Sequence, residues 1–370
     1  MTLDPDEQHD LRMTARGFFE KHSDEPAVRS TMESEEGFDR ELWATMAEQL
    51  GLPALLIPEK FGGSGFGFAE LQIVSEEMGR ALLCAPFLSS AVLAAQSLLA
   101  SGDDERCGQI LPSIADGSLL AALAFTDQRG QFDSVDDCVR ADEHGGRWRL
   151  NGRRMFVLDA ASADVVLVAA ASPQGPGLFA VDKRADGYRA SALETLDMTR
   201  RQAHVDFNDV DAALIGEVGG ADHYLRHAFN VALAALAAEQ VGGARRVMEM
   251  SVEYAKIREQ FGRPIGSFQA IKHKCADMLL EVESATSAAY AAGAALDTSS
   301  AEAALLASLA KSYCSEAYSH AAAETIQVHG GIGFTWEHPA HLYFRRAKSS
   351  EMLFGTPTYH RERILKELGL

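Results

Sequence analysis

The segment from Val231 to Arg258 places the strongest constraint on how this chain can fold. It contains no proline and is rich in alanine, so it is predicted to form one uninterrupted helix. The pair Gly242-Gly243 lies inside it. Because glycine has no Cβ, we expect the backbone of a neighbouring element to approach closely there. Further long helices are expected from Ala221 to the C-terminus.

The spacing of apolar residues divides the chain into three zones. From about Leu11 to Gly117, apolar residues recur every three or four positions, which indicates helices. From about Leu119 to Val210 the chain has short β-rich runs. They include a strand at 165–170 and a strand pair at 148–157 joined at Asn151-Gly152. Helices, then strands, then helices predict an α+β fold. The predicted domains are an N-terminal helical domain (1–117), a middle β domain (118–212) and a C-terminal helical bundle domain (213–370).

Charge and composition exclude several classes of function. Lys and Arg number 34 against 53 Asp and Glu, a net charge of −19, which argues against a nucleic-acid partner because such partners require a basic face. No apolar run approaches the ~20 residues that span a membrane. The acidic start at 1–7 is unlike a signal peptide, so we expect a cytoplasmic protein without a membrane partner. The five cysteines are scattered and form no CxxC pair, which predicts reduced thiols and no metal site.

Two motifs in the C-terminal zone carry the most specific signal. The first is Arg258-Glu259-Gln260-Phe261-Gly262, and the second is Gln327-Val328-His329-Gly330-Gly331. In this order and at this spacing they resemble the C-terminal helical domain of the acyl-CoA dehydrogenase family. The stretch 50–63 resembles the family's first helical domain with its glycine loop, and 151–156 resembles its β domain. The resemblance therefore spans nearly the whole chain.

The family resemblance implies both a fold and a reaction. The implied fold has an N-terminal helical domain, a middle β-barrel-like domain and a C-terminal four-helix bundle. In the implied reaction an acyl-CoA thioester becomes the 2,3-enoyl-CoA: a carboxylate base removes the α-proton while the β-hydrogen leaves as hydride to FAD. Electron-transferring flavoprotein is the implied electron acceptor.

The resemblance assigns the flavin contacts to two halves. The partner-side half, which in the family is reached across a dimer interface, is intact here. It places Arg258, Phe261 and Gln269 near the pyrophosphate and adenosine, with Gln327 and Gly331 on the neighbouring helix. Arginine suits this position because its planar fork matches phosphate oxygens.

The ring-side half, which holds the isoalloxazine ring, departs from the family pattern. The family has threonine-glutamate-proline followed by glycine-serine-aspartate, and the segment 126–133 keeps only Thr126 and Asp133. Phe156 replaces a tryptophan that packs on the flavin, and Leu158 lacks the hydroxyl of the family's threonine. A further cofactor contact by motif match is Thr356.

Neither usual position of the catalytic base carries a carboxylate. Phe354 stands where many members have glutamate, and Ala232 stands where some relatives place it instead. Glu239 is the alternative candidate, because it lies in an apolar run and burial raises the pKa of a carboxyl group. Glu249 lies on the same predicted helix, and Glu351 lies just before Phe354.

Other residues receive a structural interpretation. His329 is predicted to be a packed histidine, and His338 and His341 lack a third metal ligand. Arg245-Arg246 is a weak candidate for contact with CoA. The arginines predicted to form ion pairs between helices or subunits are Arg345, Arg346 and Arg361.

An intact partner-side half, an altered ring-side half and a missing base together predict a supporting subunit. We expect the chain to be the subunit without the base in a heterotetramer, completing the flavin site of a sister subunit. Paired dehydrogenases that act on steroid side chains have this arrangement. The alternatives are a self-sufficient homo-oligomeric dehydrogenase or oxidase with a base elsewhere, and a flavin-free scaffold that binds acyl-CoA.

Overall fold

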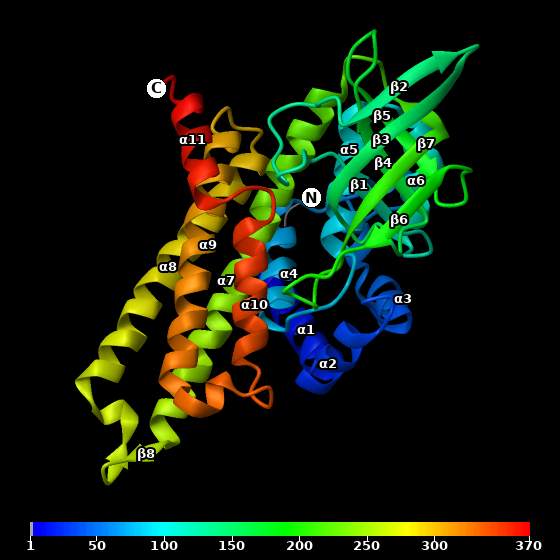
Figure 1. The fold of residues 1–370 in the computed structure, drawn as a ribbon. Coiled ribbons are helices and arrows are strands. Elements are labelled where there is room, and N and C mark those ends of the chain that lie inside the picture. The colour runs from blue at the N-terminus through cyan, green and yellow to red at the C-terminus, as the bar shows by residue number, and fades with distance from the viewer. Residues whose placement is uncertain (1–2) are drawn as a thin grey trace. The chain divides into compact units, whose positions relative to one another are not determined.

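The computed structural model describes residues 3–370, which fold into two compact units. The first unit includes Thr31–Gly67 and Cys84–Ala232; the second consists of Leu3–Ser30, Phe68–Leu83 and Leu233–Leu370. The chain therefore passes between the units more than once, and each unit is described by itself. Figure 1 labels the α-helices and the strands β1 to β8.

The helices of the first unit are mostly short. They are α3 (Arg40–Leu50), η1 (Leu52–Ala54), η2 (Glu59–Phe61), the π-helix η3 (Phe87–Ala94), α5 (Ala95–Ser101) and α6 (Asp104–Ala115). The α3 helix has a clear beginning and end in the sequence. The Asp39 carboxylate accepts hydrogen bonds from the first free backbone N–H groups, and Gly51 ends the helix in the left-handed conformation.

One seven-stranded sheet occupies the rest of this unit. Its strands are β1 (Ala121–Ala124), β2 (Val139–His144), β3 (Arg147–Leu158), β4 (Val165–Ala170), β5 (Gly177–Asp182), β6 (Tyr188–Ala192) and β7 (Gln202–Ile215). The order is β1-β4-β5-β7-β3-β2, with β6 also paired to β7; β1 and β4 are parallel and the other pairs are antiparallel. The strand predicted at 165–170 is confirmed as β4.

The sheet is open, whereas the family resemblance implied a barrel-like domain. Within residues 3–370 no ladder joins the end strands β1 and β2. A single bridge between Arg140 and Ala171 brings β2 close to the end of β4. The short strand β1 packs against the π-helix, which covers the edge that would otherwise need another strand.

The hairpin predicted at Asn151-Gly152 is wrong, because β3 continues through these residues. The turn lies between β2 and β3, at Gly145-Gly146, where both residues have the positive φ of a two-residue hairpin (60° and 80°). The pairing of β3 with β7 shifts between Leu150 and Gly152, so the glycine belongs to a bulge. A Cβ on Gly152 would lie 2.8 Å from the Cα of Val139, so the strands pass too closely for a side chain.

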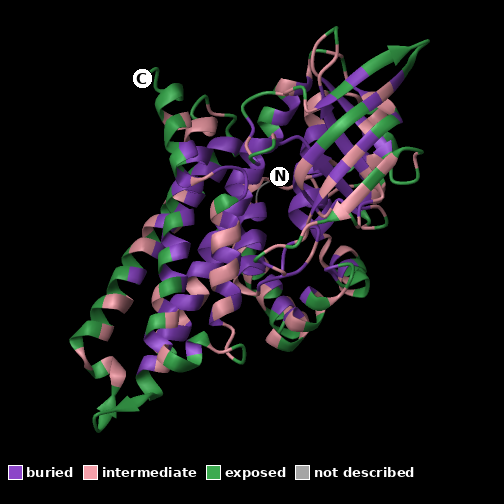
Figure 2. Ribbon diagram, in the orientation of Figure 1, coloured by how far each residue is buried: buried purple, intermediate pink, exposed green. Residues whose placement is uncertain are grey.

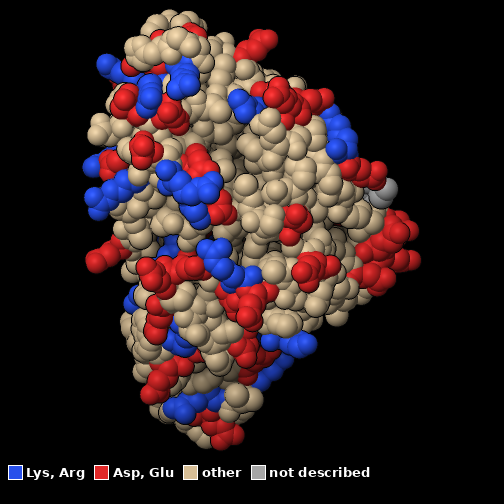
Figure 3. All heavy atoms as spheres, turned by 90° about the vertical axis from the view of Figure 1, so that its right-hand side faces the viewer, with Lys and Arg blue, Asp and Glu red and all other residues tan. Residues whose placement is uncertain are grey.

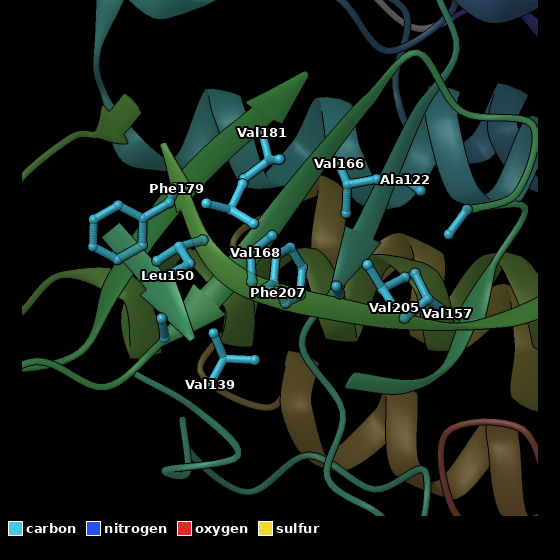
Figure 4. Packing of buried hydrophobic residues seen from close by; sticks show 14 of the residues in the cluster. Ala122, Val139, Leu150, Val157, Val166, Val168, Phe179, Val181, Val205 and Phe207 are labelled. Carbon is cyan, nitrogen blue, oxygen red and sulfur yellow. The ribbon is translucent and has the colours of Figure 1, made fainter. Parts of the chain in front are cut away.

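Alternating side chains of the strands form the core of the sheet. Ala122, Val139, Leu150, Val166, Phe179 and Val205 are each less than 2% exposed and come from six strands (Figure 4). The ring of Trp148 packs 5.2 Å from that of Phe179. Burying a valine or phenylalanine side chain stabilises a fold by about 1.5–3 kcal/mol, so this cluster is a major source of stability.

The second unit is almost entirely helical; α7 begins in the first unit, and the last residues of α2 also belong to the first unit. The helices are α1 (Pro5–His22), α2 (Glu25–Glu33), α4 (Phe68–Arg80), α7 (Ala221–Ile257), α8 (Gln269–Asp297), α9 (Ala303–His329), η5 (Gly330–Phe334), α10 (Ala340–Met352) and α11 (Pro357–Glu367). The tip of this unit has a small hairpin, β8 (Glu259–Gln260) and β9 (Arg263–Pro264), followed by η4 (Ile265–Ser267). The predicted uninterrupted helix is confirmed as α7.

The close approach predicted at Gly242-Gly243 is also confirmed. A Cβ on Gly242 would lie 2.7 Å from the carbonyl carbon of Glu76 and 3.0 Å from the nitrogen of Arg80, both in α4. A second contact completes the crossing, since a Cβ on Gly79 would lie 2.7 Å from the carbonyl carbon of Glu239. The backbones of α4 and α7 therefore touch through a pair of glycines.

Buried charges join α1 to α4. The Glu77 side chain is 1% exposed and accepts hydrogen bonds from Arg12 (2.9 Å) and from two nitrogens of Arg16 (2.8 and 2.9 Å). Arg12 also forms an ion pair with Glu76 at 2.9 Å. Two arginines thus compensate two carboxylates that the helix packing removes from water.

Candidate flavin and acyl-CoA site

The turn between α10 and α11, residues 353–356, is called here the base turn. Phe354 lies in it with 2% of its surface exposed and a φ of 62°, and Gly355 follows with a φ of 106°. The Phe354 carbonyl accepts a hydrogen bond from His360 Nε2 at 3.1 Å. Burial and the nearby Lys311 lower the pKa of His360 to about 2, so this ring is neutral. The position that the family resemblance assigns to the base therefore presents a hydrocarbon side chain, which cannot accept a proton.

A buried lysine holds the base turn from the side of α9. Lys311 is fully buried, and its ammonium group donates to the Gly355 carbonyl (3.1 Å), the Glu351 carbonyl (3.2 Å) and Ser315 Oγ (3.0 Å). Two of these acceptors are backbone oxygens: the Gly355 carbonyl lies in the turn, and the Glu351 carbonyl lies just before it. The shape of the turn therefore depends on backbone contacts.

The alternative base candidates are involved in ion pairs. Glu239 lies 2.7 Å from Arg346, whose side chain is 4% exposed and which also donates to the Leu83 carbonyl at 3.3 Å. Glu249 lies 2.6 Å from Arg80. Both carboxylates thus link helices of the second unit.

Glu351 is similarly engaged, and Ala232 is fully buried on α7. The Glu351 carboxylate accepts hydrogen bonds from Lys348 (2.8 Å) and Ser319 (2.5 Å). Burial alone would raise its pKa, but these hydrogen bonds hold the pKa of Glu351 below its usual range. A carboxylate with a lowered pKa is a poor general base.

Two members of the ring-side half lie close to the β3 strand. Thr126 is buried and its hydroxyl donates to the Met155 carbonyl at 3.2 Å, so that hydroxyl is used within the protein. Phe156 is half-buried with a φ of 56°, beside an irregularity in the pairing of β3 with β7. A Cβ on Gly130 would lie 3.5 Å from the Phe156 ring, so the loop after Thr126 packs on that ring.

An aromatic cluster that sequence reasoning missed stands beside Thr126. The rings of Phe125, Phe132 and Phe229 lie 5.2 to 5.9 Å apart, and each ring is 3% exposed or less. The family resemblance aligns Phe132 with the serine of the pattern, and the structure shows this ring buried. The signal available in the sequence was a phenylalanine on each side of the 126–131 segment.

A buried arginine was missed as well. Arg154 is 1% exposed, forms an ion pair with Asp136 and donates to the carbonyls of Ala169 (2.7 Å) and Thr126 (3.3 Å). It therefore fixes the backbone of the ring-side half from inside the sheet. The false hairpin at Asn151-Gly152 obscured it, because Arg154 was then placed in a separate strand.

All five members of the partner-side half are exposed on the second unit. Phe261 is 91% exposed in the turn between β8 and β9, and the other exposed members are Arg258, Gln269, Gln327 and Gly331. Figure 2 shows this tip of the helical unit as mostly exposed. One guanidinium and two amide groups provide donors of the kind that bind phosphate and nucleotide oxygens.

Large apolar side chains accompany these donors. Ile257, Phe334 and Trp336 are 77%, 79% and 48% exposed. Exposed apolar residues gathered near polar ones are typical of protein–protein interfaces. The remaining predicted contact, Thr356, precedes α11 and caps it, because its hydroxyl accepts the Tyr359 backbone N–H at 3.3 Å.

The interpretations of His329, Arg346 and Arg361 agree with the structure, and Arg345 lies over the Trp336 ring. His329 is buried and stacked on Tyr254, so it is a packed histidine as predicted. The predicted arginine ion pairs include Arg346 with Glu239 and Arg361 with Glu316. Arg245, the weak candidate for CoA contact, pairs with Glu283 at 2.7 Å.

The remaining findings, on membrane-spanning helices, metal sites, cysteines and surface charge, apply to residues 3–370 as a whole. None of their helices has the length and apolar character to span a bilayer, and they contain no cluster of three histidine, cysteine or acidic side chains arranged for a metal ion. All five cysteines are free thiols; Cys84, Cys107 and Cys314 are buried, whereas Cys138 and Cys275 are only partly buried. Positive and negative side chains are interspersed on the face drawn in Figure 3.

Comparisons with known proteins cover nearly the full length. The family description "Acyl-CoA dehydrogenase, N-terminal domain" matches residues 5–118, and "Acyl-CoA dehydrogenase, C-terminal domain" matches 223–369. The chain is 38% identical over 365 residues to acyl-CoA dehydrogenase IpdE2 of Mycobacterium tuberculosis, covering 98% of both chains.

Two solved structures of paired proteins are similar in fold. The Tcur3481-Tcur3483 steroid ACAD variant is 31% identical with a TM-score of 0.88, covering 98% of both chains. The ChsE4-ChsE5 complex from Mycobacterium tuberculosis is 29% identical with a TM-score of 0.89, covering 99% of this chain and 98% of the other. The chain therefore belongs to the acyl-CoA dehydrogenase family, a family of FAD-binding oxidoreductases that act on CH–CH bonds.

Proposed function

We propose that this chain is the subunit without the catalytic base in a heterotetrameric acyl-CoA dehydrogenase that forms a 2,3-enoyl-CoA. The observation that carries the proposal is the buried Phe354 in the base turn. The other candidate carboxylates, Glu239, Glu249 and Glu351, are all held in ion pairs. A sister subunit would supply the base.

The two halves of the flavin site support the same role. The partner-side half fits FAD, since its guanidinium and amide donors are exposed and close to exposed apolar residues. Arg258, Gln269 and Gln327 would hold the pyrophosphate and adenosine of an FAD whose ring lies in the sister. FAD supplies the hydride acceptor of the reaction. The ring-side half fits poorly, because the Thr126 hydroxyl is engaged and Phe132 replaces the serine.

The similar solved structures suggest the substrate and the assembly. One is a steroid ACAD of two components, and the other is a complex of two proteins. We therefore propose a steroid side-chain acyl-CoA as substrate, electron-transferring flavoprotein as electron acceptor and a cytoplasmic location.

The first test compares the chain alone with the chain co-expressed with a candidate sister. We expect the chain alone to be colourless and inactive, and the complex to show oxidised-flavin absorbance that acyl-CoA bleaches without oxygen. Flavin bands and turnover from the chain alone would instead support a self-sufficient enzyme. A complex that forms but never binds flavin would support the scaffold.

A second test concerns the partner-side half. Arg258→Met in this chain should weaken FAD binding by the complex about tenfold, because one charge-assisted contact to phosphate is lost. Arg184→Met is the control, since Arg184 is an exposed arginine paired with Asp182 in the β sheet. Equal FAD affinity in both variants would argue against Arg258 as a cofactor contact.

A further inference from the structure

Three aromatic rings pack against one another where α9 ends and the following segment begins. His329, the last residue of α9, lies between Tyr254 and His338, with ring centroids 4.4 and 4.3 Å away. His338 comes shortly before α10 begins at Ala340. The two histidines therefore contact each other across the chain reversal that contains η5, Gly331 and the exposed Phe334.

Hydrogen bonds define the protonation of this pair. His338 Nδ1 accepts the Ala340 backbone N–H at 3.2 Å, so this nitrogen carries no proton in the observed arrangement. His329 Nδ1 lies 2.8 Å from the Thr325 carbonyl and must donate to it. A proton added to His338 Nδ1 would remove the acceptor and would also place a cation against the neighbouring ring.

The charged groups around the pair oppose that added proton overall. Arg29 of α2 and Arg345 of α10 both lie over the Trp336 ring, at 5.7 and 5.0 Å. His341 stacks on the same ring at 4.4 Å. Glu25 of α2 is the acidic group that acts on His338, and it favours protonation. His329 and His341 therefore oppose a charge on His338, and Glu25 alone favours it among these groups, while the two arginines lie over the Trp336 ring on which His341 stacks.

We propose that His329 and His338 form a pH-sensitive clasp that positions the Gly330-Gly331 segment, so that acid opens the segment and releases FAD. The flavin part of this inference rests on the proposed function. The clasp itself depends only on contacts within this chain. Both residues are positioning residues, since neither is proposed to touch the substrate.

The direction of the pH effect follows from burial. Burial lowers the pKa of His329, and burial together with the His329 charge lowers the pKa of His338. A histidine with a lowered pKa stabilises the folded arrangement fully above its ordinary pKa of 6.5. This stabilisation is lost as the pH falls below that value, because the opened segment takes up the proton.

The clasp can be tested in the chain alone by hydrogen exchange. Protection of residues 330–340, corrected for intrinsic rates, should fall by up to about tenfold per pH unit below the ordinary pKa for each proton taken up. His338→Asn should remove most of this dependence, since an asparagine oxygen can accept the Ala340 N–H but does not titrate. His320→Asn on α9 is the control, because His320 is 45% exposed and pairs with Glu281. Equal pH dependence in wild type and His338→Asn would overturn the proposal.

A second measurement connects the clasp to the cofactor. In the co-expressed complex, acidification to pH 5.5 should release FAD from the wild type several-fold more than from His338→Asn. If no FAD binds at neutral pH while the exchange result holds, the proposed function fails and the clasp stands. If FAD binds but both proteins lose it equally, the link to the cofactor is wrong.

Discussion

The crossing of α4 and α7 gives the sharpest prediction, because one methyl group should decide between loss and gain of stability. In Gly242→Ala the new Cβ would lie 2.7 Å from the Glu76 carbonyl carbon. The Glu76 carbonyl oxygen would be nearer still. Since carbon atoms in contact need about 3.5 Å, the helices must separate by at least about 0.8 Å. The obstacle is backbone on both sides, which no side-chain rotation relieves.

The expected cost follows from two opposing terms. Overpacking of a close contact costs about 1–3 kcal/mol and sometimes more, and a backbone clash belongs at the upper end. Replacing glycine by alanine within a helix returns up to about 1 kcal/mol. We therefore expect Gly242→Ala to lose about 2 kcal/mol in free energy of unfolding, measured by urea denaturation followed by far-UV circular dichroism.

Gly17→Ala is the matched control. Gly17 lies within α1, and a Cβ there would meet nothing within 4 Å. It should gain about 0.5–1 kcal/mol. The Gly79→Ala/Gly242→Ala double variant should lose less than the sum of the single variants, since one separation relieves both clashes. A Gly242→Ala protein as stable as wild type would refute the reasoning.

The remaining predictions use the buried charges and the histidine clasp. Arg154→Met should lower the free energy of unfolding by about 3–5 kcal/mol, because it leaves the Asp136 carboxylate and two carbonyls without their partner. The control, Arg153→Met at an exposed position, should lower it by about 0–1 kcal/mol. Equal urea midpoints for the two variants would contradict this. Glu77→Gln should lower the free energy of unfolding by about 2 kcal/mol relative to the exposed control Glu41→Gln, because Arg12 and Arg16 lose a charged acceptor. An unchanged urea midpoint would show that this ion-pair network contributes little to stability. The complex should lose FAD below about pH 6.5, and the fluorescence of released flavin would report this loss. FAD that stays bound below this pH would contradict the inferred titration of His338.

Local signals predicted the elements well. Alanine content and the absence of proline predicted α7, and β-branched residues predicted β4, because each signal acts within the element itself. The signal at Asn151-Gly152 failed, because the same dipeptide suits a hairpin and a bulge; the choice depends on how closely Val139 passes. Whether the barrel-like sheet closes could not be predicted from local signals, since closure depends on pairing between distant strands.

The sequence predicted which residue types stand at the candidate site, but not which side chains they contact. Counting along the motifs predicts that Phe354 and Ala232 stand at the usual base positions, and that prediction required no structure. The ion pair of Glu239 with Arg346 joins residues far apart in the chain, so apolar sequence around Glu239 gave no sign of it. The Phe125, Phe132 and Phe229 cluster was hidden for the same reason.

The base turn has an evolutionary consequence. Lys311 and His360 hold it through backbone carbonyls, and such contacts are indifferent to which side chain occupies position 354. The cost of a positive φ is similar for glutamate and phenylalanine, since both have an unbranched Cβ. After gene duplication, one copy could therefore lose its base by substitution at this position and still keep the turn. Two related subunits could then take different roles in one active site without a loss of folding stability in either.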